Sequence, residues 1–374
     1  MIGLVRSYQQ YWQKVKTLFM NKNFYSFGVF LLALLSNLLS ISSCDFKSQN
    51  HRLQTARNYD SLLALKNTLP IERKLSTANP SREAEALYKY LLNIYGKKIL
   101  SGQMWAPWSY DELKYIQEKT GKQPALRGMD FITQRDNEAE VKHAIDWWNS
   151  GGIPTIMWHW GAPGIGEGYE NSKKMIDIDN CFREGTEEHS AFWAELKAKA
   201  DLLEKIRDAH VPVLWRPYHE LNGDWFWYGK QGPERFKKLW VTMYNYFVHE
   251  RGLNNLIWVL CYTGSPDVDW FPGNAYVDIT GADTYEGGDE PHPGMYNNVK
   301  EISKNNPMPV CYHECGVPPD PDECLDKNAM WLWWMEWHTD YLKKVDVDYL
   351  RRVYQHKLVV TKDEVPDIMK VYGK

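Results

Sequence analysis

The feature of this sequence that most constrains its fold is a regular alternation of short apolar runs with helical patterns. Eight apolar runs follow one another after residue 97. Four of them open with a proline at the first or second position, where a missing N–H disturbs a strand least. The eight runs are residues 98–102, 124–131, 153–160, 211–220, 256–262, 277–285, 308–314 and 331–337. Such alternation predicts a parallel sheet whose strands are joined by crossover helices.

Helix start and stop signals fall between these runs. Asn79, followed by Pro80, is the expected N-cap of the first helix, and Gly96 is expected to end it in the left-handed conformation. Ser109 and Glu112 have the spacing of a capping box for the next helix. Further helices are expected over residues 138–149, 190–208 and 233–251, which end near glycines or at the start of the next run.

Eight strand–helix units in succession favour one fold class over its nearest rival. They match the α/β (β/α)8 TIM barrel, whereas an open doubly wound sheet usually carries a glycine-rich phosphate turn after an early strand, which this sequence lacks. We therefore predict a single catalytic barrel domain over residues 79–374. Its site is expected where the carboxyl ends of the strands meet.

The composition limits the kinds of ligand that the protein can bind. A formal charge of −4 over 374 residues leaves no broad basic face for nucleic acid. The 18 tryptophans and 23 tyrosines are unusual, and many stand beside polar residues at strand ends. We expect one group of tryptophans to offer ring faces to a ligand. These are Trp158, Trp160, Trp225 and Trp227.

The beginning of the chain has the pattern of a targeting signal. Residues 27–39 are an apolar run shorter than a membrane span, which fits the h-region of a signal peptide. The following Ile-Ser-Ser-Cys resembles a bacterial lipoprotein signal, in which Cys44 becomes the lipidated first residue. A natural start for such a signal is Met20, which would make residues 1–19 an artefact of start assignment.

These patterns predict a signal peptide over residues 1–43 and a polar tether over residues 44–78. The protein is then expected in the bacterial cell envelope, held by a lipid to the periplasmic or surface face of a membrane. A membrane anchor that is never cleaved is the alternative.

The remaining cysteines suggest neither a disulfide framework nor a metal site. Five are left once Cys44 is set apart, so at least one thiol has no partner within the chain. Whether any disulfide forms is left open. No pair has the spacing of a zinc site, and we expect no metal and no organic cofactor.

Two glutamates carry the strongest chemical signal. Glu220 ends the fourth run and Glu314 the seventh, so the two carboxyl groups lie on facing sides of the expected barrel. Such a pair could protonate a glycosidic oxygen and attack the anomeric carbon. The alternative is a pair of structural salt bridges with Arg216, but two strand-end glutamates are costly to bury without a use.

Other polar residues are expected around this pair. His219 directly precedes Glu220, so both can face the site only if the strand end twists or bulges. His159 ends the third run and could bind sugar hydroxyls or be structural. Asp283 and Tyr285 share a face of the sixth run, where Tyr285 suits the nucleophile's carboxylate and Asp283 suits hydroxyls or an arginine.

These motifs together resemble glycoside hydrolase family 26, the β-mannanases of a large clan of retaining glycosidases. The resemblance rests on Trp-Arg-Pro-Tyr-His-Glu-x-Asn-Gly-x-Trp-Phe-Trp in the fourth run, Trp-His-Trp in the third, Asp-x-Tyr in the sixth and Glu-Cys-Gly in the seventh. The histidine before the first glutamate distinguishes this family within the clan. The resemblance implies that Glu220 is the acid/base and Glu314 the nucleophile. It places further residues around the cleaved sugar, namely His159, Arg216, His219, Trp225, Asp283, Tyr285 and a tryptophan of the eighth run, for which we choose Trp337 over Trp334.

The resemblance implies a monomeric, retaining endo-β-1,4-mannanase that acts on mannan, glucomannan or galactomannan. Two alternatives remain. One is an exo-acting relative that releases mannobiose, with residues 161–189 as a candidate wall of the site. The other is an inactive carbohydrate-binding lipoprotein, which would be expected to lack one of the two glutamates.

Overall fold

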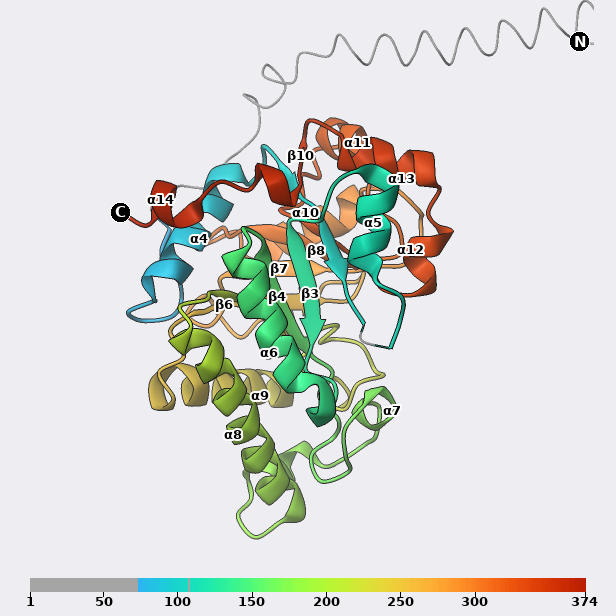
Figure 1. Ribbon diagram of the computed structural model, residues 1–374. Helices are drawn as coiled ribbons and strands as arrows, with labels where there is room; N and C mark the ends of the chain where they lie inside the picture. Colours follow the sequence, from blue (N-terminus) through green and yellow to red (C-terminus); the bar gives the residue numbers. More distant parts are fainter. Residues whose placement is uncertain (1–72, 107) are drawn as a thin grey trace, which may run out of the picture. The chain divides into compact units, whose positions relative to one another are not determined.

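The computed structural model describes residues 73–106 and 108–374, and its central feature is a closed barrel of eight parallel strands (Figure 1). The barrel strands are β2 (Gly102–Met104), β3 (Leu126–Asp130), β4 (Ile153–Trp158), β5 (Val213–Pro217), β6 (Leu256–Tyr262), β7 (Ile279–Ala282), β8 (Val310–Cys315) and β9 (Trp334–Glu336). Each pairs with its neighbour in chain order, and β2 closes the ring on β9. The predicted TIM barrel is confirmed.

Helices connect the strands on the outside of the barrel, as Figure 1 shows for α5, α6 and α8. They are α4 (Arg82–Ile94), α5 (Glu112–Thr120), α6 (Gln134–Asn149), α7 (Tyr169–Ser172), α8 (Glu187–Asp208), α9 (Pro233–Asn245), α10 (Pro293–Ile302), α11 (Pro321–Asp326), α12 (Asp340–Lys344), α13 (Val347–Tyr354) and α14 (Ile368–Tyr372). A π-helical turn, η2 (Tyr246–Glu250), extends α9. No helix in the part of the chain that the structure describes is long and apolar enough to cross a membrane.

The first apolar run, residues 98–102, gives only its last residue, Gly102, to a barrel strand, contrary to the prediction. Its residues form β1 (Ile99–Leu100), which pairs with β10 (Val359–Val360) in a separate two-stranded sheet. The barrel strand follows directly as β2. Gly102 is required in β2 because a Cβ there would stand 2.4 Å from the carbonyl oxygen of Trp334.

The two predicted N-caps were each placed too early. The hydroxyl of Ser81 accepts from the N–H of Ala84 and begins α4, whereas Asn79 lies in a left-handed turn before it. In α5 the cap is Asp111, whose carboxylate accepts from the N–H of Lys114. In both cases the true cap lies two residues after the predicted one, directly before the first residue of the helix.

The barrel domain starts earlier than residue 79. Leu75 and Thr77, which the sequence placed in the tether, are buried, and the N–H of Ser76 donates to Asp278 Oδ1 over 2.5 Å. The predicted signal peptide, Cys44 and the tether up to residue 72 lie outside the described residues.

Most of the tryptophans predicted to face a ligand are core residues instead. Trp158, Trp160 and Trp227 are buried, and only Trp225 is exposed. The rings of Trp158 and Trp160 stack at 3.9 Å, and the indole N–H of Trp227 donates to the Trp160 carbonyl. Burial of an indole whose N–H is satisfied contributes mainly packing, so these side chains stabilise the strand ends from outside the site.

Candidate active site

A pocket of about 340 Å³ opens where β3, β4, β5, β8 and β9 end. Polar and aromatic side chains line it together. They are Trp108, Asp130, Ile132, His159, Tyr169, His219, Glu220, Phe226, Tyr285, Glu314, Trp337, His338 and Tyr341. Of the predicted site residues, His159, His219, Glu220, Tyr285, Glu314 and Trp337 line this pocket. It is therefore the site to which the sequence pointed.

The end of β5 leaves regular strand geometry, which brings two consecutive side chains into the pocket. Tyr218 and Glu220 both have φ of 51°, in the left-handed region that non-glycine residues seldom adopt. This turn allows His219 and Glu220 to face the same cavity, as the sequence required of a functional strand end. Non-glycine residues held in such conformations cluster at functional sites.

An irregularity in β8 has the same effect on Glu314. Tyr312 is in register with Trp334 and Cys315 with Glu336, so β8 carries one residue more than β9 between these pairs. The extra residue is a β-bulge, which re-aims side chains at the rim of a barrel. His313 and Glu314 can therefore both turn inward, although they are consecutive.

Glu314 is buried and is held from one side by Tyr285. The phenol of Tyr285 donates to Glu314 Oε2 over 2.7 Å, as the sequence predicted. The other oxygen, Oε1, accepts no hydrogen bond from any described residue and lies 3.9 Å from the Arg216 guanidinium. The carboxylate is oriented, yet one of its oxygens is not engaged.

Arg216 and Asp283 lie below the pocket and do not line it. Arg216 is fully buried and donates to Thr155 Oγ1 over 2.9 Å and to the ring of His313 over 2.8 Å. Asp283 is also buried, with its carboxylate 3.2 Å from the other ring nitrogen of His313. These two predicted site residues thus act on Glu314 from behind. His313, which connects them, was not among the predicted site residues.

A charged pair adds positive potential at the edge of the pocket. The ring of His159 contacts the Asp130 carboxylate, and its backbone N–H donates to Asp130 Oδ1 over 3.0 Å. Burial disfavours the charged form of both groups, but the attraction and hydrogen bonds between the two partners have the larger effect. The pKa of Asp130 is therefore lowered and the pKa of His159 is raised. Asp130 thereby favours the protonated form of His159, whose charge lowers the pKa of both Glu220 and Glu314.

The two glutamates differ in the groups that act on their charge, and the pKa of both is raised, that of Glu314 to about 8. Burial raises the pKa of both carboxyl groups, and the charge of Glu220 raises the pKa of Glu314 further. Arg216 and the Tyr285 hydroxyl favour a negative charge on Glu314, whereas the indole of Trp225 is the one donor to Glu220 among the described residues. We infer an ionised Glu314 and a protonated Glu220, the arrangement that a nucleophile and an acid need.

The mouth of the pocket gathers the exposed aromatic side chains of the domain. Of the tryptophans, tyrosines and phenylalanines that the structure describes, four are more than a third exposed. They are Trp108, Tyr169, Trp225 and Tyr341. Three line the pocket, and the indole of the fourth, Trp225, donates to Glu220 Oε2 over 2.6 Å. Exposed rings around a polar pocket suit the apolar faces and hydroxyl edges of sugars.

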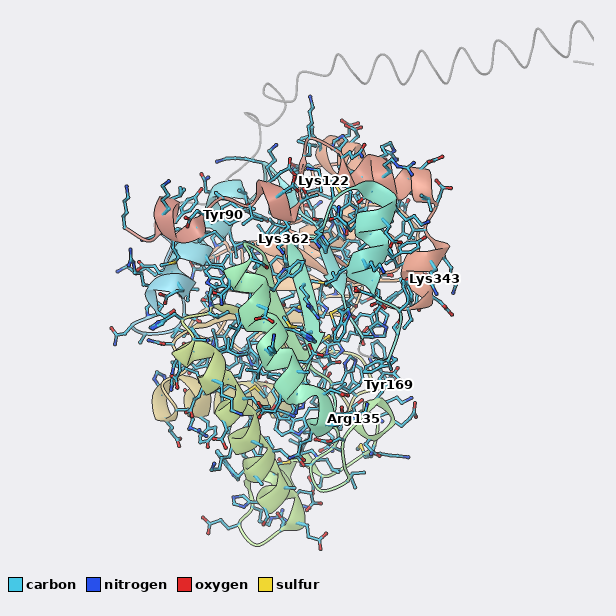
Figure 2. The ribbon with its side chains drawn as sticks, in the orientation of Figure 1. Tyr90, Lys122, Arg135, Tyr169, Lys343 and Lys362 are labelled. Carbon is cyan, nitrogen blue, oxygen red and sulfur yellow. The ribbon has the colours of Figure 1, made fainter. Side chains whose placement is uncertain are left out.

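Sequence reasoning missed Trp108, Tyr169 and Tyr341 because they lie in a turn and in the short helices α7 and α12, with no strand-end position to mark them. Tyr169, labelled in Figure 2, belongs to α7 within residues 161–189, the segment expected to form a wall. The choice between two tryptophans of the eighth run was correct in geometry: Trp337 lines the pocket, whereas Trp334 is buried against Tyr354. The five cysteines of the domain are buried free thiols.

Trp225→Phe is expected to extend activity to higher pH. The indole N–H stabilises the ionised form of Glu220, so its loss raises the pKa of that carboxyl and keeps the acid protonated further into the basic range. The basic limb of the kcat/KM profile should move up by roughly half a pH unit to one unit. Trp108→Phe, whose ring contacts His338, should leave that limb in place. An unmoved limb in Trp225→Phe would show that this bond does not set the pKa of the acid.

Comparison with known proteins agrees with this geometry. The sequence profile of glycosyl hydrolase family 26 matches residues 76–364. A mannan endo-1,4-beta-mannosidase of Thermothelomyces thermophilus is 35% identical over 79% of this chain and 64% of its own length. Mannan endo-1,4-beta-mannosidase B of a Piromyces species is 34% identical over 76% of this chain and 52% of its own length. The chain thus spans about half to two thirds of these two relatives.

A solved structure extends the likeness to three dimensions. It is a β-mannanase from a symbiotic protist of the termite Reticulitermes speratus, complexed with a gluco-manno-oligosaccharide. It superposes with a TM-score of 0.72 at 33% identity and covers 80% of this chain and 98% of its own.

Proposed function

The chain belongs to glycosyl hydrolase family 26, and from that membership we propose that it is a retaining endo-β-1,4-mannanase acting on mannan, glucomannan or galactomannan. The observation that carries the proposal is the pairing of Glu220 and Glu314 in one pocket with different partners. Glu314 is held by the Tyr285 hydroxyl and lies 3.9 Å from the Arg216 guanidinium, whereas Glu220 accepts a hydrogen bond from the Trp225 indole. The relatives named for mannan hydrolysis support the choice of substrate.

The proposed reaction is a double displacement. Glu314 attacks the anomeric carbon while Glu220 gives its proton to the departing glycosidic oxygen, and a glycosyl ester on Glu314 results. Glu220, now ionised, takes a proton from water, whose oxygen attacks the same carbon and frees Glu314. Esterification removes the charge of Glu314, which lowers the pKa of Glu220 and prepares it for its second role.

Substrate and stereochemistry can be tested together. The purified protein is expected to cleave mannan and glucomannan but not xylan or mixed-linkage glucan. Proton NMR should show that the first-formed reducing end is β-configured, because attack by Glu314 and then by water inverts the anomeric centre twice. Failure on both mannans would overturn the substrate assignment, whereas an α-configured first product would overturn the double displacement alone.

Endo action is part of the proposal, and its rival is the release of mannobiose from a chain end. Residues 161–189 bring Tyr169 into the pocket from one side, so this segment bounds the site. End-labelled manno-oligosaccharides separate the two modes. A mixture of internal products is expected, and early release of mannobiose alone would establish exo action.

We also propose that the chain is anchored to a bacterial membrane by a lipid on Cys44 after removal of residues 1–43. The support is the sequence pattern around Cys44. Cys44→Ser should move the protein from the membrane fraction to the soluble fraction. If residues 1–43 are found on the mature protein by mass spectrometry, the lipoprotein proposal is wrong.

A further inference from the structure

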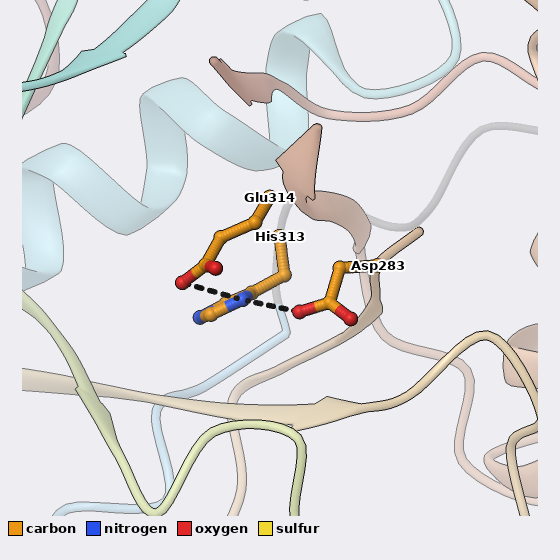
Figure 3. Close-up of side chains that lie close together, drawn as sticks. All are labelled: Asp283, His313 and Glu314. Atoms are coloured by element: carbon orange, nitrogen blue, oxygen red, sulfur yellow. Dashed lines mark hydrogen bonds and ion pairs between the residues drawn. The ribbon is translucent and has the colours of Figure 1, made fainter. Parts of the chain in front are cut away.

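His313 stands at the centre of a buried network directly beneath Glu314. Its side chain is fully buried, and both ring nitrogens have charged neighbours. Nε2 lies 2.8 Å from a guanidinium nitrogen of Arg216. Nδ1 lies 3.2 Å from Asp283 Oδ2 and 3.5 Å from Glu314 Oε1 (Figure 3). The ring therefore joins one cation to two carboxyl groups.

The neighbours of the ring determine which nitrogen carries its proton. A guanidinium has only donors, so Nε2 must accept from Arg216 and the proton must lie on Nδ1. Burial, with the charges of Arg216 and His159, places the pKa of His313 well below its ordinary value, so the ring is neutral. The single N–H of the ring thus faces Asp283 and Glu314 together.

A cation at this position is the competing interpretation. The Asp283 and Glu314 carboxylates and a ring nitrogen of His313 lie within 4.8 Å of one another, a set that could hold a metal ion. A metal on Nδ1 would need the lone pair of that nitrogen, which is free only if the proton moves to Nε2. An N–H there would point at the N–H of Arg216, and the guanidinium charge would repel the cation. The donors and acceptors of this network therefore favour a proton on Nδ1 of His313 and disfavour a metal ion there.

We propose that His313 is a positioning residue for Glu314, and that its Nδ1–H is a donor shared between Asp283 and the nucleophile. Glu314 Oε2 is already held by Tyr285, and Oε1 accepts no hydrogen bond within the described part of the chain, so the Nδ1–H, whose nitrogen lies 3.5 Å away, is placed to hold this second oxygen. The assignment rests on the proposed function, in which Glu314 is the nucleophile. When Glu314 becomes an ester and loses its charge, the N–H stays with Asp283.

The titratable groups around His313 come from the ends of several strands. Arg216 approaches from β5, Asp283 from the end of β7, and Glu314 follows in β8 itself. The neutral ring of His219 stacks on it at 5.7 Å, and protonated His159 lies beyond that ring at 4.3 Å. Glu220 and Tyr285 complete the set through Glu314. Within residues 73–106 and 108–374, the ring of His313 is the one side chain with polar contacts to both Arg216 and Asp283.

Two substitutions separate the functions of the two ring nitrogens. His313→Asn can place an amide N–H near the position of Nδ1, whereas His313→Gln places its amide near Nε2 and leaves the carboxylates without the donor. We expect His313→Asn to keep kcat within about tenfold and His313→Gln to lose about 100-fold, with KM unchanged in both because the ring does not line the pocket. His249→Gln, on the surface turn η2, serves as the control for a histidine change.

The pH profile should report the loss of the donor. An N–H near ionised Glu314 lowers its pKa, so in His313→Gln that pKa rises and the protonated, inactive form persists to higher pH. The acidic limb of kcat/KM should therefore move up by about one pH unit in this variant. Equal losses in both variants with an unmoved acidic limb would reduce His313 to a packing residue and overturn the proposal.

Two measurements do not depend on activity. Two-bond ¹H–¹⁵N correlations of the wild-type protein should show the proton of His313 on Nδ1, and a ¹³C titration of the Glu314 carboxyl should show a higher pKa in His313→Gln. A proton on Nε2, a charged ring or an unchanged Glu314 pKa would each refute the assignment. If the wild type cleaves no mannan, the proposed function fails, but these spectra still decide the network.

Discussion

Glu314→Ala is expected to lower kcat/KM by about 10⁴-fold or more on every substrate, including those with activated leaving groups. Without the carboxylate no glycosyl ester can form, and protonation of the leaving group by Glu220 cannot replace that step. A better leaving group or a higher pH does not supply the missing nucleophile either. Glu314→Gln should be similarly inactive, because the amide keeps the shape and loses the charge. The measurement is initial rate on mannan and on an activated aryl β-mannoside.

This loss should occur without unfolding. Glu314 is buried with a raised pKa, so its removal relieves a desolvation cost that offsets the loss of a carboxylate 3.9 Å from Arg216, which keeps its hydrogen bonds to Thr155 and His313. The melting temperature is expected to stay near that of the wild type. Glu118→Ala, which removes an exposed carboxylate of α5, is the control and should keep full activity. Substantial activity in folded Glu314→Ala would assign the nucleophile to another residue.

Glu220→Ala is expected to divide the reaction into its two steps. Mannan should be cleaved about 10² to 10⁴-fold more slowly, because the sugar leaving group needs a proton. The phenolate group of an activated aryl mannoside leaves without protonation. The first step on this substrate should therefore proceed and release one burst of phenol. The glycosyl ester should then accumulate, since no base remains to activate water.

Azide gives the decisive measurement on this variant. It attacks the ester without help from a base, so turnover should recover with azide concentration and yield a mannosyl azide of β configuration. Glu314→Ala should show no such product. Absence of both a burst and azide rescue in folded Glu220→Ala would remove Glu220 from the role of acid/base.

The barrel was predictable because its strands and helices differ in local pattern. Runs such as 256–262 are apolar along their whole length, and proline or glycine marks their limits, so each unit could be recognised alone. The first run, which contains Ile99 and Leu100, was assigned to the wrong sheet because two apolar residues do not indicate which strand they pair with. Its pairing with Val359 and Val360 depends on residues at the other end of the chain.

The site was predictable where it lies on strand ends and not where it depends on tertiary contacts. Glu220, Glu314 and Tyr285 were found because a strand that ends in a carboxylate or a phenol is visible in the sequence. Whether Trp158 and Trp160 face a ligand or each other depends on helix packing, which no local pattern encodes. The role of His313 likewise depends on the approach of Arg216 from a strand across the barrel.

The small sheet of β1 and β10 has a consequence for the order in which the molecule folds. The hydroxyl of Ser101 donates to the carbonyl oxygen of Val360, 259 residues later. The N–H of Ile99 likewise donates to the carbonyl oxygen of Leu358. Contacts of such long separation form late, because the intervening loop must first be closed. During synthesis the segment just before β2 must wait until nearly the whole chain has left the ribosome. The segment that leads into the barrel is made early and is thus expected to be among the last parts of the domain to be fixed in place.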